Sequence, residues 1–303
     1  FTVGNLETLA DREGGSVRDE LLAIYRKYYS ANIMKLVVLG RENLDQLQAM
    51  VQPRFAVVEN ANVAVDIHSE PFFEPGSLPR LVSAVPLQDS RELSLSFPIP
   101  RMLPHWQGKS ASYLAALIGH EGDGSLLDSL KKRGWAESLG AGLALEDRGS
   151  ALFSVDIALT PAGFENRDKV VEMFFAWVAL IGNQGIERWR YEQQSQLNQI
   201  AFRFQEKQNP VSYAYSLASM MQRYPVKDVL QANFVMNDFD SKLLSEIAAL
   251  LTVDNLFMQL TAPDIETDRV SLMYQTPYAV TAIAPEQLDS WRAPESYPEL
   301  GLP

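Results

Sequence analysis

The stretch LIGHEGDGSLLDSLKKRGWAESLGAGL, residues 117–143, decides the fold, because it joins two helices and a strand through a glycine-rich turn. Apolar residues at helical spacing predict one helix over 109–118 and a second over 125–132. Glycine tolerates conformations that break helices, and three glycines separate the two segments: Gly119, Gly122 and Gly124. From residue 139 the period changes to two, which predicts a strand.

The rest of the chain extends this pattern into an α+β fold. A second alternating segment at 151–159, after the charged turn EDRG, predicts an antiparallel hairpin with the first strand. Further strands are expected at 80–85 and 92–97, and long helices from Thr160 onward. We therefore predict a two-layer, α/β-roll-like domain with a mainly antiparallel sheet and packed helices.

The N-terminal block has a different order of elements. Ser16 and Asn43 are placed to cap two amphipathic helices, and IMKLVVL (33–39) between them predicts a strand. Periodicity lapses after residue 60. We expect three parts: residues 1–60 as a partial first domain of helix, strand and helix, residues 61–79 as a linker, and residues 80–303 as a second domain.

Composition excludes some classes of function. The net charge of -12, without a basic patch, excludes nucleic acid as a partner. The longest apolar run, 174–182, is too short for a membrane span, and the first residues do not resemble a signal peptide. The absence of cysteine leaves the compartment undetermined. The missing initiator Met predicts an excised piece of a longer protein.

The histidines do not predict a metal site. A zinc peptidase helix needs two histidines one turn apart with a glutamate beside them, so that both imidazoles reach one ion. The three histidines are His68, His105 and His120, and neither HExxH nor HxxEH occurs. His120 is better explained as a histidine at a helix C-terminus. No metal ligand and no catalytic residue is predicted.

Other catalytic motifs are also missing. The segment Gly122–Ser125 could indicate a phosphate-binding loop, but a helix precedes it and the motif's lysine is absent. No GxSxG motif occurs, and the acidic pair Glu146 and Asp147 fits a solvated turn.

The segment Gly140–Gly142 suits a binding strand. Glycine weakens strand packing but lets another backbone approach, as pairing of a peptide with a sheet edge requires. A bulge, or close packing against a helix, would explain the same glycines. The sequence leaves these alternatives open.

The chain resembles the pitrilysin and insulin-degrading enzyme family of zinc metallopeptidases, the M16 or insulinase family. The resemblance is carried by residues 117–143, and in the same order by FTVGNLETL (1–9), residues 18–47, LSFPIP (95–100) and FRF (202–204). It implies the end of the catalytic domain followed by the second, inactive domain. The family's zinc helix, HxxEH, lies before the segment with which this chain begins, so zinc is expected in the longer protein and no cofactor in this piece.

The resemblance also implies an exosite, a site that anchors a peptide away from the scissile bond. Gly119 and Glu121 correspond to the anchor for the peptide's amino terminus, and the pairing strand corresponds to Leu139, Gly140, Ala141, Gly142 and Leu143. Phe1 corresponds to an aromatic residue bordering the cleft. Ala141 and Leu143 replace a glycine and a polar residue of the insulin-degrading branch, and Ser112 and Ala116 replace its histidines.

The predicted function is thus the non-catalytic, peptide-anchoring portion of a zinc metalloendopeptidase that degrades short peptides in a closed chamber. Its partners would be peptide substrates and the remaining domains of the protease. The alternative is a purely structural or interaction module without peptide binding. Some relatives suggest a periplasmic or secreted location, and a cytoplasmic one stays open.

Overall fold

The computed structural model describes residues 4–65 and 70–302, so Phe1 and His68 lie outside the described residues. The α-helices are α1 Val17–Tyr28, α2 Leu44–Phe55, α3 Ser110–Ile118, α4 Leu126–Lys132, α5 Pro161–Glu165, α6 Arg167–Gln184, α7 Arg188–Arg203, α8 Pro210–Met220, α9 Ser241–Ala248 and α10 Pro285–Arg292. Short 3₁₀ turns are η1 Ala31–Ile33, η2 Leu103–His105, η3 Val226–Asp228 and η4 Val253–Asn255. The strands are β1 Arg80–Ala84, β2 Glu92–Pro100, β3 Ala136–Glu146, β4 Ser150–Leu159, β5 Phe257–Thr261, β6 Arg269–Val270 and β7 Pro277–Thr281.

The chain divides into two compact units. The first contains residues 1–67 and 201–233, and the second contains residues 68–200 and 234–303. The second unit holds the sheet and the stretch 117–143, and it carries the candidate site.

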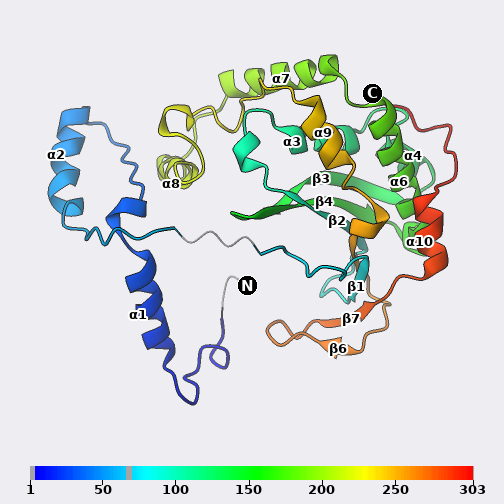
Figure 1. The fold of residues 1–303 in the computed structure, drawn as a ribbon, viewed down its shortest axis with the longest axis horizontal. Helices are drawn as coiled ribbons and strands as arrows, with labels where there is room; N and C mark the ends of the chain where they lie inside the picture. Colours follow the sequence, from blue (N-terminus) through cyan, green and yellow to red (C-terminus); the bar gives the residue numbers. More distant parts are fainter. Residues whose placement is uncertain (1–3, 66–69, 303) are drawn as a thin grey trace. The chain divides into compact units, whose positions relative to one another are not determined.

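One sheet organises the second unit. Its strand order is β3-β4-β2-β5-β1-β7-β6, so β3 is an outermost strand (Figure 1). The pairs are antiparallel except β1 with β5, which run parallel. The sequence predicted a mainly antiparallel sheet and the β3–β4 hairpin. It did not predict β7, α10 or the parallel pairing of β1 with β5.

The core lies on the side of the sheet that the helices cover (Figure 1). Because side chains alternate along a strand, every second residue of β2 and β4 points to the helices. Leu93, Leu95 and Phe97 of β2 are fully buried, and the Phe97 ring stacks on Phe174 of α6 with 5.7 Å between centroids. Each such side chain contributes roughly 1.5–3 kcal/mol of hydrophobic stabilisation. The predicted α+β, two-layer class is confirmed.

Local chemistry explains where the hairpin turns. The Asp147 carboxylate accepts hydrogen bonds from the backbone N–H groups of Gly149 and Ser150, both at 2.7 Å. These contacts lower the pKa of Asp147, because they stabilise its charged form. The solvated turn predicted at Glu146 and Asp147 is therefore present at Asp147, whereas Glu146 accepts from the backbone N–H groups of Met102 and Leu103.

In the first unit the two predicted helices are confirmed, but the prediction of a strand between them is wrong. Asn43 and Gln46 form a capping box at the start of α2. Residues 34–39 are neither strand nor helix, and Met34, Leu36 and Val38 are each 40–45% exposed. A strand needs a neighbour for its N–H and C=O groups, and none of the described residues pairs with this segment.

Candidate functional site

The glycine-rich turn and the outermost strand lie against each other. Helix α3 ends at Ile118, and Gly119 follows it as the C-cap. A Cβ atom added at Gly119 would lie 3.1 Å from the Ala115 carbonyl oxygen and 3.9 Å from the backbone nitrogen of Ala141. The structure thus brings the predicted anchor residue Gly119 beside the predicted pairing strand.

Glu121 and His120 follow Gly119 with different environments. Glu121 is exposed. His120 is half-buried, and its Nδ1 atom accepts a hydrogen bond of 3.0 Å from the backbone N–H of Gly122. The imidazole therefore shapes the turn. Among the residues with described positions, no three His, Asp or Glu side chains form a group that could hold a metal ion. The described residues accordingly do not fit a zinc site.

Three further contacts, which the glycine-rich motif did not indicate, fix the turn. The backbone N–H of Gly124 donates to Asp128 Oδ2 at 2.9 Å, and Lys132 Nζ lies 2.6 Å from Asp123 and 2.7 Å from Asp128. Gly124 has a φ of +79°, which glycine adopts without strain. Its carbonyl accepts from the N–H of Gly301, so the C-terminal segment supports the turn. The Ser125-x-x-Asp128 spacing is typical of a capped helix start, and it was the sequence signal from which these contacts could have been predicted.

Strand β3 has one free edge, which we call its rim, where its backbone N–H and C=O groups face no other described strand. It pairs with β4 on one side, with Leu139 opposite Ile157 and Ala141 opposite Val155, and no described strand lies on its other side. Leu139 is buried, Ala141 packs on the core, and Leu143 is 39% exposed. The β3 register is irregular at 136–138 and 143–145 but regular at the glycines. A Cβ atom at Gly140 or Gly142 would have no neighbour within 4 Å, so neither a bulge nor close packing explains these glycines.

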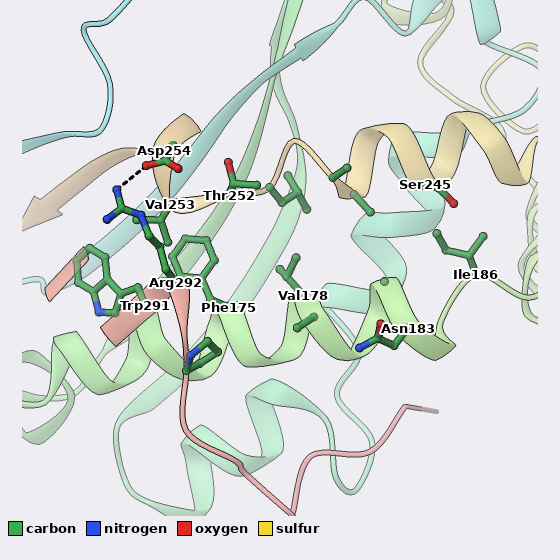
Figure 2. A pocket seen from close by; sticks show the side chains of 16 residues that line it. Phe175, Val178, Asn183, Ile186, Ser245, Thr252, Val253, Asp254, Trp291 and Arg292 are labelled. Carbon is green, nitrogen blue, oxygen red and sulfur yellow. Dashed lines mark hydrogen bonds and ion pairs between the residues drawn. The ribbon is translucent and has the colours of Figure 1, made fainter. Parts of the chain in front are cut away.

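A separate cavity lies away from this strand, between α6, α9 and α10 (Figure 2). It has a volume of about 600 Å³, and Phe175, Val178 and Trp291 form part of its wall. The two charged residues of the lining, Asp254 and Arg292, pair with each other at 2.6 Å. The cavity offers no unpaired charged group, and we place the candidate site at β3.

Phe1, expected to border a cleft, lies outside the described residues. The described part of the chain contains no helix that combines the length and the apolar character of a membrane span.

Comparison with known proteins agrees with the fold. The chain is 35% identical over 308 residues to the A-factor-processing enzyme of Saccharomyces cerevisiae and 34% identical over 308 residues to human insulin-degrading enzyme. Both alignments cover 100% of this chain and 30% of the relative. A crystal structure of pitrilysin superposes with a TM-score of 0.91 at 28% identity, over 98% of this chain and 32% of that one.

The chain thus spans about 30% of the length of these curated relatives. Residues 202–303 match the family described as the middle or third domain of peptidase M16. Residues 16–198, more than half of the chain, match the family described as the peptidase M16 inactive domain. The chain, with its seven-stranded sheet and its glycine-rich turn, therefore belongs to the peptidase M16 family.

Proposed function

We propose that this chain is the non-catalytic, peptide-anchoring portion of a zinc metalloendopeptidase of the pitrilysin and insulinase type, which degrades short peptides in a closed chamber. The observation that supports this most is the free rim of β3 beside Gly119 and the exposed Glu121. An unpaired strand edge supplies main-chain N–H and C=O groups to an extended peptide whatever its side chains. Carbonyl groups and a carboxylate next to that edge can accept hydrogen bonds from a peptide's terminal ammonium group.

In this proposal, residues 1–60 are the end of the first, catalytic domain, residues 61–79 are a linker, and residues 80–303 are the second domain. Catalysis and zinc belong to parts of the longer protein outside this chain. The partners are peptide substrates and those other parts. Gly119 and Glu121 hold the peptide's amino terminus, and Leu139, Gly140, Ala141, Gly142 and Leu143 pair with its backbone.

Binding of short extended peptides to the 303-residue chain tests the proposal. Glu121→Gln should weaken binding of a peptide with a free amino terminus about three- to tenfold, because a charged hydrogen bond contributes on the order of 1.5 kcal/mol and exposure reduces it. The same substitution should leave an N-acetylated peptide unaffected. Isothermal titration calorimetry measures both dissociation constants.

Glu137→Gln is a matched control, since Glu137 is an exposed carboxylate on β3. This substitution should change the dissociation constants of the free and the N-acetylated peptide equally. An N-methylated peptide, which lacks main-chain donors, should bind more weakly than its parent. The proposal fails if neither peptide binds, or if acetylating the terminal amine and methylating the N–H groups leave the dissociation constant unchanged. The chain is then better explained as a structural or interaction module without peptide binding.

A further inference from the structure

The sheet has a second face, opposite the helices, and its side chains are small or polar near β3. Alternation places Gly140 and Gly142 of β3 on this face, together with Ser154 and Asp156 of β4 and Ser94 and Ser96 of β2. The register aligns them in rows that run across the strands. One row contains Gly140, Asp156, Ser94 and Gln259, and the next contains Gly142, Ser154, Ser96 and Phe257.

The first row forms the floor of a cavity of about 480 Å³. Its lining includes Ser138 and Gly140 from the free strand, with Asp156, Ser94 and Glu92 behind them. The cavity therefore adjoins the rim of β3 on the second face.

Asp156 is the charged group of this row, and its charge is not neutralised. Its exposed carboxylate accepts a hydrogen bond from the Ser94 hydroxyl, and it forms no ion pair among the residues that the structure describes. Arg91, which directly precedes β2, pairs with Asp89 at 2.8 Å. Arg80 lies on the second face of β1, which is three strand spacings from β4, or about 14 Å.

Gly140 leaves the path from the rim to Asp156 open. A peptide paired with β3 would lie two strand spacings from β4, about 9.5 Å. Any side chain at position 140 would stand between them, but Gly140 has none, and no atom lies within 4 Å of its missing Cβ position. The long side chains of lysine and arginine can cross such a gap with the cationic group at the far end.

We propose that Asp156 is a specificity-determining residue, which selects a lysine or arginine of the bound peptide at the position alongside Gly140 on the second face. This inference rests on the proposed function, because it requires a peptide paired with β3. The chain's net charge of -12 favours a basic peptide in the encounter as well.

The neighbouring row provides an internal contrast. Two residues further along the peptide, the second-face side chain would lie beside Gly142 and face Ser154. The hydroxyl oxygens of Ser154 and Ser96 are 2.6 Å apart in a buried hydrogen bond, without a charge. The preference for a cation should therefore be weaker at this second position than at the position alongside Gly140.

A positional scan tests this inference. Octapeptides with a free amino terminus and an uncharged background each carry a single lysine, or norleucine as its uncharged analogue, at successive positions. At one position, lysine should bind the 303-residue chain about three- to fivefold more tightly than norleucine, the range of a partly exposed ion pair. The ratio should fall in 0.5 M NaCl, because salt screens exposed charges.

Asp156→Asn should reduce this ratio to about one, since asparagine can still accept from Ser94 but has no charge. Gly140→Leu should do the same by filling the gap. Asp19→Asn, an exposed carboxylate on α1 outside the sheet, should leave the ratio unchanged. Circular dichroism verifies that each variant folds.

The results separate the two proposals. If the peptides bind but lysine has no advantage at any position, or keeps it in Asp156→Asn, Asp156 does not select the cation and the anchoring function stands. If no peptide binds, the anchoring function fails and this inference fails with it.

Discussion

Single glycines in this chain have opposite roles, and the structure predicts opposite effects of adding one methyl group. At Gly163, near the start of α5, an added Cβ would lie 1.8 Å from the Trp135 carbonyl oxygen, which is backbone and cannot move aside. At Gly182, inside α6, the added Cβ would have no atom within 4 Å apart from its chain neighbours and the backbone of its own helix. The first glycine is required by close packing, whereas the second only weakens its helix.

We therefore expect Gly163→Ala to lower the free energy of unfolding by roughly 3 kcal/mol, the upper part of the range for overpacking. Gly182→Ala should raise it by about 0.5–1 kcal/mol, the helix propensity difference. Urea denaturation, followed by the fluorescence of the buried Trp177 and Trp291, measures both values. Equal effects of the two substitutions would contradict the geometry.

At the scale of elements, the start of α4 holds the turn that carries Glu121. The hydrogen bond from Lys132, and after it the N–H of Gly124, lower the pKa of Asp128. A carboxyl group whose pKa is lowered by folding stabilises the folded state above its unfolded pKa of about 4. That stabilisation disappears as the pH falls through the lower, folded pKa.

Asp128→Asn should therefore reduce the stability of the chain at pH 7, and the difference from the unsubstituted chain should shrink as the pH falls below about 4. Urea denaturation at a series of pH values measures this difference. Asp19→Asn, which has no such contacts with a turn, serves as the control. A difference that stays constant from pH 7 to pH 2.5 would show that the charge of Asp128 does not hold the turn.

At the scale of the whole molecule, the two units differ in how much apolar surface they bury. Helices α1 and α2 have 12 residues each and no buried residue, and Leu21, Ile24 and Tyr25 of α1 are 51–60% exposed. Isolated helices of this length are marginal in water. The strands β2 and β4 instead carry the fully buried side chains of the core.

We expect the backbone amides of residues 17–55 to exchange with deuterium at least roughly 100-fold faster than those of β2 and β4, because local opening costs little where nothing is buried. Hydrogen exchange with mass spectrometry measures the rates. In our proposal other parts of the longer protein cover these faces, so the same amides should be slow there. Equal protection of α1 and β2 in the 303-residue chain would refute the difference in stability.

Only the local part of the candidate site could be predicted from the sequence. The alternation of Leu139, Ala141 and Leu143 depends on neighbours along one strand, so it is visible in the sequence. The proximity of Gly119 to Ala141, and the row that joins Gly140 to Asp156, depend on strand register and on packing of α3. Such contacts between distant residues leave no local pattern.

The sequence by itself determined most of the helices, the β3–β4 hairpin, the absence of zinc-peptidase motifs and the resemblance to a family, because periodicity, capping and motif spacing are local. Only the tertiary structure decided that β3 is an outermost strand and that residues 34–39 form no strand. A strand exists only where another segment supplies its hydrogen-bond partners, and which segments meet is a property of the whole fold.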